Sequence, residues 1–339
     1  MPGFAGVGEK SEKEKIMTYV DQLKEKVLNQ QGISREEALA LYEEPLEELC
    51  QAADEIRKCF CKDGFDICTI INGKSGRCSE NCKYCAQSAY YHTSAEEYPL
   101  LSTEEIVRQA KYNADRGVLR YSIVTSGRCL NDAEVDRMCE SIQAIKKNVE
   151  IEVCVSFGLL NEEQFCRVKA AGATRAHNNL ETSRRNFPNV CTTHTFEDKV
   201  AAIKAAKAAG LNVCSGGIMG LGETKEDRID MALSLRELGI RSVPVNMLNP
   251  IPGTPYEENQ RLMVDDMRRI MAVYRFILPE ASIRLAGGRG LMEDKGEGCF
   301  KSGANAVISG DMLTTAGYTI ETDMDMIRGL GYKAALCNG

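Results

Sequence analysis

The sequence has no tryptophan, and only three of its 339 residues are histidine. It also lacks a run of lysine or arginine, and its net charge of −7 argues against nucleic acid or an anionic membrane as the main partner. No stretch is apolar over the length that a membrane-spanning helix needs. Because residues 1–15 have no apolar core that a secretion signal could use, we expect a cytoplasmic protein.

Cysteine, by contrast, is abundant, with fifteen residues. In a reducing compartment disulfides are rare, so metal binding or catalysis is the leading use of any cysteine cluster. Most of the fifteen need no special role. We interpret Cys139 and Cys166, which lie on helical patterns among apolar neighbours, as small buried hydrophobic residues.

Short β-branched runs alternate with amphipathic helical segments along most of the chain. Several of these helical segments end on a glycine that leads into the next strand, as expected for a left-handed helix cap; these are Gly117, Gly172, Gly210, Gly239 and Gly303. The strand-like runs are residues 65–72, 120–127, 151–158, 173–181, 211–220, 241–248, 282–288 and 305–311. Eight strand–helix units predict an α/β fold, a (β/α)8 barrel of the TIM type. An open doubly wound sheet is the alternative, but no G-x-G-x-x-G motif follows the first strand.

The barrel accounts for only part of the chain. Residues 1–62 are expected to form an N-terminal helical extension, with a capping box at residues 34–37. The barrel is expected to span residues 63–320, and residues 321–339 to form a closing helix and tail.

Three cysteines, Cys78, Cys82 and Cys85, lie in the segment "CSENCKYC" just after the first predicted strand. In a barrel, chemistry takes place where strands end and loops begin. A structural zinc site usually has four protein ligands, and so does a purely electron-carrying iron–sulfur cubane. Three thiolates leave one iron of a cubane open to bind a substrate or cofactor. Zinc remains the alternative at this point.

This C-x3-C-x2-C spacing, with Tyr84 before the third cysteine, resembles the radical S-adenosylmethionine (SAM) superfamily. The resemblance implies a 4Fe–4S cluster on Cys78, Cys82 and Cys85, whose open iron binds SAM and whose electron cleaves it to a 5′-deoxyadenosyl radical. A second mark of the superfamily is G-x-I-x-G-x-x-E, which runs from Gly216 to Glu223. There Gly216 would allow close approach to the adenine and Ile218 would pack on it; a tight turn before the next helix is the structural alternative.

Within the superfamily, the resemblance extends along the barrel to the biotin synthase family. It is carried by "HNNLETS" (177–183), "CSGGIMGLGET" (214–224), "SVPVNML" with "GTP" (242–255), "IRLAGGR" (283–289) and "GANAVISGDMLTT" (303–315). The resemblance implies insertion of sulfur between two saturated carbons of dethiobiotin, at a cost of two SAM. It further implies an auxiliary iron–sulfur cluster as the sulfur source, a flavodoxin or ferredoxin as electron donor, and a homodimer.

The resemblance also implies residue roles. Tyr84 would stack near the adenine, Asn179 and Glu181 would bind the ribose of SAM, and Asn246 would bind the ureido ring of dethiobiotin. Thr314 and Thr315 would meet the substrate carboxylate. The auxiliary cluster would be held by Cys154, Cys214 and Arg284, although ordinary strand burial is the alternative for the two cysteines.

The chain departs from the family pattern around this auxiliary cluster. Ser122 stands where a third cysteine ligand is usual, while Cys68 and Cys191 are additional cysteines. The hypothesis is a relocated cluster, either 2Fe–2S or a larger four-iron cluster, held by Cys154, Cys214, Cys191 and Cys68. The alternative is that Cys191 and Cys68 are buried without a role. His177 and His194 are interpreted as packed or solvated side chains rather than ligands or proton carriers.

Two other functions compete with biotin synthesis. Related radical SAM enzymes, a hydrogenase-cofactor maturase and a methylornithine synthase, do not need a deep sulfur-donating cluster. A metal-binding scaffold without turnover would not need the glycine-rich strand end or the asparagine pair at residues 178–179.

Overall fold

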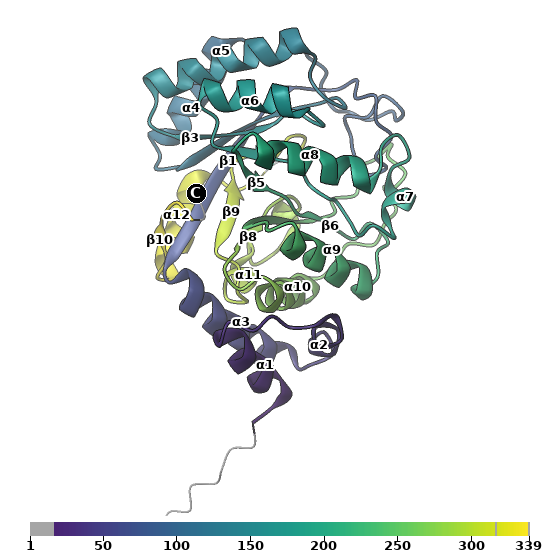
Figure 1. Ribbon diagram of the computed structural model, residues 1–339, viewed down its shortest axis with the longest axis vertical. Coiled ribbons are helices and arrows are strands. Elements are labelled where there is room, and N and C mark those ends of the chain that lie inside the picture. The colour runs from purple at the N-terminus through teal and green to yellow at the C-terminus, as the bar shows by residue number, and fades with distance from the viewer. Residues whose placement is uncertain (1–16, 316, 338–339) are drawn as a thin grey trace, which may run out of the picture.

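The computed structural model describes residues 17–315 and 317–337. The first sixteen residues of the predicted N-terminal extension, Ala316 and the last two residues of the predicted tail therefore lie outside the described residues. Within the described chain, parallel strands close into a barrel with helices around it (Figure 1).

The barrel closes because its first strand pairs with its last. The order of pairing is β1-β2-β3-β4-β5-β7-β8-β9, and β9 returns to β1 through Ile67 and Val307. All these pairs are parallel. The strands are β1 (Gly64–Lys74), β2 (Arg120–Thr125), β3 (Glu152–Ser156), β4 (Arg175–His177), β5 (Asn212–Cys214), β6 (Gly217–Met219), β7 (Ser242–Met247), β8 (Ser282–Leu285) and β9 (Ala306–Ser309). Each predicted run coincides with a strand of the barrel, the fifth with both β5 and β6, which confirms the TIM-type fold.

The fifth predicted strand differs from expectation because it is broken into two pieces. The chain leaves the ladder after Cys214, and β6 then pairs with β7 from Gly217 onward. The residue between them, Gly216, is pressed against the neighbouring strand: a Cβ atom there would lie 1.8 Å from the carbonyl oxygen of Pro244. The break is therefore a site of close backbone packing that only glycine permits.

Helices form where apolar residues recur at helical spacing, and most begin at a side-chain cap. Ser34, for example, caps α2 with Glu37 in the capping box predicted from the sequence. The five predicted cap glycines all have positive φ, between +65° at Gly239 and +113° at Gly172. The helices are α1 (Tyr19–Leu28), α2 (Arg35–Leu41), α3 (Leu46–Cys61), α4 (Thr103–Ala114), α5 (Asp132–Asn148), α6 (Glu162–Ala171), α7 (Phe187–Val190), α8 (Phe196–Ala208), α9 (Lys225–Glu237), α10 (Val264–Ile277), α11 (Glu297–Phe300) and α12 (Ile320–Gly329).

The segments before and after the barrel pack on its outside. Helices α1 to α3 gather below the barrel, where α3 packs against α10 (Figure 1). After α12, a strand that the sequence analysis missed, β10 (Lys333–Ala334), pairs with the start of β1. The boundaries proposed at residues 62/63 and 320/321 stay predictions. None of the helices described here is long and apolar enough to cross a membrane.

The two cysteines predicted to be buried on helices differ in their exposure to solvent. Cys139 is partly buried, but Cys166 on α6 is exposed, so its interpretation as a buried residue was wrong. Helix α6 presents Phe165 and Val168 to the core, and Cys166 lies on another face of the helix.

Candidate active site

A cavity of about 390 Å3 runs into the barrel from the loops that follow its strands. Its mouth is lined by residues of the three-cysteine loop, and its inner part by Arg120 and Arg175, the first residues of β2 and β4. The cavity therefore extends from the C-terminal face of the barrel down to the level where the strands begin.

The three-cysteine loop folds back on itself at the mouth. The N–H of Cys78 donates to the carbonyl of Gln87 at 2.9 Å, and the N–H of Ala89 donates to the carbonyl of Cys78 at 2.8 Å. Cys78 and Cys85 line the cavity, whereas Cys82 does not. Three thiols carried by one short loop, two of them facing the cavity, suit a cubane that is anchored on three sulfurs.

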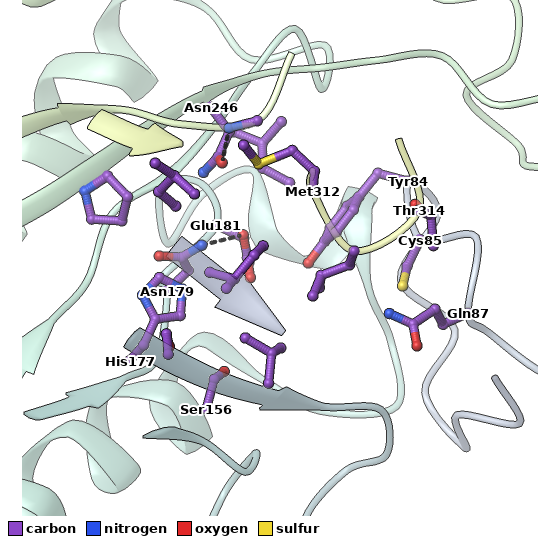
Figure 2. Close-up of a pocket in the computed structure, with 18 of the residues that line it drawn as sticks. Tyr84, Cys85, Gln87, Ser156, His177, Asn179, Glu181, Asn246, Met312 and Thr314 are labelled. Carbon is purple, nitrogen blue, oxygen red and sulfur yellow. Dashed lines mark hydrogen bonds between the residues drawn. The ribbon is translucent and has the colours of Figure 1, made fainter. Parts of the chain in front are cut away.

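Next to this loop, Tyr84, Asn179 and Glu181 form a polar group (Figure 2). Asn179 Nδ2 donates to Glu181 Oε2 at 3.4 Å, and the N–H of Gly216 donates to Asn179 Oδ1 at 3.1 Å. Glu181 has a φ of +69°, and its backbone is held by hydrogen bonds to Gly216 and Ile218. Burial, together with the nearby Glu181 carboxylate, raises the pKa of Tyr84 well above its usual value.

The two residues of the G-x-I-x-G-x-x-E motif that were predicted to contact adenine have different positions. Ile218 lines the cavity, but Gly216 does not. The structure explains the glycine at position 216 by its contact with Pro244 and by its hydrogen bonds to Asn179 and Glu181. Packing alone therefore accounts for a glycine at this position, and contact of Gly216 with adenine stays a prediction.

The predicted substrate residues lie on the same cavity. The amide of Asn246 donates to the carbonyl of Gly217 at 2.9 Å and accepts from the N–H of Gly287 at 2.8 Å. These two bonds fix the amide and leave one of its N–H groups and one oxygen lone pair available. Thr314 and Thr315, on the loop after β9, also line the cavity.

Deeper in the barrel, three cysteines face the cavity from three strands: Cys68 of β1, Cys154 of β3 and Cys214 of β5. All three are buried. Ser122 of β2, which also lines the cavity, is the register partner of Cys154. The structure thus brings together Cys68, Cys154 and Cys214, as the sequence hypothesis required, with Arg284 beside them.

Buried charges surround these cysteines. Asp66, at 0% exposure, forms ion pairs of 3.0 Å with both Arg120 and Arg284, and its pKa is lowered because the nearby guanidinium groups outweigh its burial. Arg175 is also buried here. Together the three arginines and Asp66 carry an excess of positive charge. Nη2 of Arg120 is buried without a hydrogen-bond partner among the described residues. An anionic group such as a thiolate-ligated cluster fits this surrounding.

Cys214 has the environment of a thiolate. Burial alone would raise its pKa, but a hydrogen bond from His177 and the charges of Arg284 and Arg175 lower it to about 6. Ser242 Oγ also donates to Cys214 Sγ at 3.2 Å. His177 therefore has a defined partner in the cavity, which its interpretation as a packed or solvated side chain did not foresee.

Cys191 lies elsewhere. It does not line the cavity, and its Sγ is 3.6 Å from Sγ of Cys82, in a contact where Cys82 is the donor in the metal-free chain. The structure therefore does not group Cys191 with Cys154 and Cys214. His194, beside Cys191, is 6% exposed, and its Nδ1 lies 2.6 Å from Oε2 of Glu80, so it is not a solvated histidine.

Comparison with known proteins agrees with these features. Residues 72–235 match the model of the radical SAM superfamily, and residues 244–333 match that of the Biotin and Thiamin Synthesis associated domain. A biotin synthase of Brachyspira hyodysenteriae is 60% identical over 317 residues, which cover 94% of this chain and 95% of that protein. A biotin synthase of Akkermansia muciniphila is 58% identical over 320 residues, covering 94% of this chain and 100% of that protein. The chain belongs to the biotin synthase family. Membership in this family makes it a radical SAM enzyme and implies a 4Fe–4S cluster and SAM.

The fold of this biotin synthase family member is shared more widely. The crystal structure of a methylornithine synthase superposes with a TM-score of 0.78, covering 93% of this chain and 97% of that chain, at 20% identity. At that identity the likeness concerns the fold alone.

The sequence analysis of this family member missed the deep arginines. Arg120 and Ser122 are two residues apart on β2, and Arg175 and His177 are two residues apart on β4. Side chains two apart on a strand point to the same side, so both residues of each pair face the cavity. An arginine two residues before an inward-facing side chain was the available signal.

Proposed function

We propose that the chain inserts sulfur into dethiobiotin to form biotin and consumes two SAM for each product. The observation that carries this proposal is the cavity described above. It reaches two separate sets of thiols: Cys78 and Cys85 at the mouth, and Cys68, Cys154 and Cys214 inside. A sulfur insertion needs a site that opens C–H bonds and a site that holds sulfur, both within reach of one substrate.

At the mouth, Cys78, Cys82 and Cys85 would hold the 4Fe–4S cluster. When bound, the cluster and SAM supply a radical able to abstract hydrogen from an unactivated carbon. The chain's own residues bind and orient the cofactor: the carboxylate of Glu181 and the amide of Asn179 suit the two hydroxyls of a ribose. Ile218 and Tyr84 offer apolar surface for the adenine.

The substrate would lie between the two sets of thiols. Asn246 keeps one donor and one acceptor free, which matches the N–H and C=O groups of a ureido ring. The hydroxyls of Thr314 and Thr315 would receive the carboxylate. The cavity walls would exclude water from the reacting carbons.

Inside the barrel, Cys68, Cys154, Cys214 and Arg284 would hold the auxiliary cluster that provides sulfur. This ligand set revises the one expected from sequence, because Cys191 contacts Cys82 instead. Arg284 is fixed by Asp66 and by the carbonyl of Val307, which accepts at 2.8 Å. The cluster is either 2Fe–2S or a larger four-iron cluster, and iron and sulfide counts distinguish the two.

The remaining features of the proposal rest on resemblance to the family. These are a flavodoxin or ferredoxin as electron donor, a homodimer and a cytoplasmic location. The competing functions are a maturase or methylornithine synthase type of radical SAM enzyme and a scaffold without turnover. The three inward-facing cysteines favour sulfur insertion over both.

The test uses protein reconstituted with iron and sulfide under anaerobic conditions and then supplied with SAM, a reductant and dethiobiotin. We expect biotin and 5′-deoxyadenosine by mass spectrometry. Cys154→Ala and Cys214→Ala should lose biotin and auxiliary iron but still cleave SAM, whereas Cys59→Ala, on the exposed surface of α3, should behave as wild type. SAM cleavage without biotin in the wild type would indicate a sister enzyme, and no cleavage would indicate a scaffold.

A further inference from the structure

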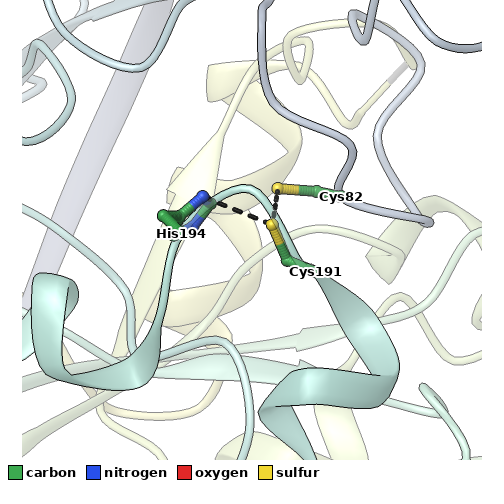
Figure 3. A group of neighbouring side chains, drawn as sticks. All are labelled: Cys82, Cys191 and His194. Atoms are coloured by element: carbon green, nitrogen blue, oxygen red, sulfur yellow. Dashed lines mark hydrogen bonds between the residues drawn. The ribbon is translucent and has the colours of Figure 1, made fainter.

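The thiol of Cys191 belongs to the surroundings of the three-cysteine loop. Its sulfur lies 3.6 Å from that of Cys82 (Figure 3), and the residue is 3% exposed. The segment that carries Cys191 is tied to this loop by the backbone as well, since the N–H of Lys83 donates to the carbonyl of Val190 at 3.0 Å. The contact between the two sulfurs is therefore part of how the two loops pack.

Two oxygen atoms near Cys191 already take part in other hydrogen bonds. Asn81 Oδ1 lies 3.4 Å from the Cys191 sulfur, but it accepts from the N–H groups of Thr192 at 2.9 Å and Thr193 at 3.2 Å. Thr193 Oγ1, also at 3.4 Å, accepts from the N–H of Asn81 at 3.1 Å. An amide oxygen has two lone pairs, so these bonds use the capacity of Asn81. Cys82 Sγ, at 3.6 Å, and His194 Nδ1, at 3.3 Å, are further partners within reach of the Cys191 sulfur.

A mononuclear metal ion does not fit this group in the loaded enzyme. The ligand atoms of Cys82, Cys191 and His194 lie within 4.8 Å of one another, which is close enough to share an ion. However, Nδ1 of His194 lies 2.6 Å from the carboxylate of Glu80, so that nitrogen carries a proton. Cys82 is also needed by the three-cysteine cluster.

We propose that Cys191 donates an S–H···S hydrogen bond to Cys82 when Cys82 is bound to the SAM-binding cluster, and thereby raises the reduction potential of that cluster. In the metal-free chain Cys82 is the donor; iron takes the place of its proton, so the direction of the bond reverses. Hydrogen bonds to cluster sulfurs are among the factors that set the potential. His194, 3.3 Å from Cys191 and anchored on Glu80, is a positioning residue.

This inference rests on the proposed function only in that the loop carries a cluster that binds SAM. The test is a redox titration of reconstituted protein followed by EPR, using the signal of the reduced cluster that changes when SAM is added. We expect Cys191→Ala to shift the midpoint potential to a more negative value. Cys191→Ser, which keeps a hydrogen-bond donor, should stay near wild type. Cys166→Ala, which removes an exposed thiol on α6, serves as the matched control and should show no shift.

Other outcomes would overturn the inference. An unchanged midpoint potential in Cys191→Ala protein with its full content of iron and sulfide would show that the hydrogen bond does not set the potential. A loss of auxiliary iron in that variant would make Cys191 a ligand of the second cluster. If Cys191→Ala does not take up the cluster, Cys191→Val replaces it in the comparison with Cys191→Ser. Equal midpoint potentials of these two variants would again refute the inference. Biotin formation is measured separately, so the redox titration can be interpreted even if the protein forms no biotin.

Discussion

Replacing Asp66 with asparagine removes the carboxylate that two buried guanidinium groups share. Arg120 lies 3.0 Å from Oδ2 of Asp66, and Arg284 lies 3.0 Å from Oδ1. All three side chains are at most 3% exposed. The N–H of Cys337 donates to the same carboxylate at 3.3 Å. Asparagine keeps the shape of the side chain but leaves both guanidinium charges without their counter-ion.

The expected loss of stability is large because the charges are fully buried. Breaking a buried ion pair by removing one partner costs about 3–5 kcal/mol. Unfolding entropy of roughly 2.1 cal/mol/K per residue makes about 0.7 kcal/mol equivalent to one degree of melting temperature for a chain of 339 residues. Asp66→Asn should therefore lower the melting temperature by about 4–7 °C.

The assay is thermal unfolding of the metal-free, reduced protein at neutral pH. The matched control is Glu321→Gln, which removes the carboxylate of an ion pair with Arg116 at the same 3.0 Å distance but at the surface, where Glu321 is 62% exposed. Water and salt screen such a pair, so we expect no measurable shift. Equal melting temperatures for Asp66→Asn and Glu321→Gln would refute the view that the deep ion pairs stabilise this barrel.

Two further predictions concern the break in the fifth strand and the pH dependence of folding. Gly216→Ala should destabilise the protein by about 3 kcal/mol or more in urea unfolding, because the added Cβ would lie 1.8 Å from the Pro244 oxygen. The control is Gly329→Ala, which should be neutral or slightly stabilising because the space around Gly329 is open. Asp227 is buried, which raises its pKa, but bonds from Arg185 and Ser183 outweigh this and lower it to about 2. Because the folded pKa lies below the unfolded value, the stabilisation is complete above about pH 4 and is lost as the pH falls towards 2. Urea titrations should show this loss in the wild type relative to Asp227→Asn, and parallel pH curves for the two proteins would contradict it.

The barrel strands could be predicted from sequence because short β-branched runs alternate with helical segments, several of which end on glycine. The predicted run 65–72, for example, lies within the observed strand Gly64–Lys74. The break at Gly216 could not be predicted, since it depends on the approach of Pro244 from the next strand. Strand β10 was missed because it has only two residues, both exposed, and therefore no apolar pattern.

The candidate site divides in the same way. The three-cysteine loop and the residue pair Asn179 and Glu181 are local patterns, so their proximity to one cavity could be anticipated. The position of Cys191 could not, because 109 residues separate it from Cys82 and the contact depends on the packing of two loops. The buried charges of Arg120 and Arg175 are equally non-local, since their partners, Asp66 on β1 and Ser242 on β7, lie on other strands.

The break in the fifth strand links the two halves of the site. The backbone of Gly216 bonds both Asn179 and Glu181, which we assign to the cofactor, and the carbonyl of Gly217 accepts from Asn246, which we assign to the substrate. Ile218 is in turn the register partner of Asn246. On these assignments, three consecutive residues would set the distance between the bound cofactor and the bound substrate, and radical transfer depends on such a distance. A displacement of this segment should therefore weaken the binding of SAM and dethiobiotin together, even though Gly216 lines neither site.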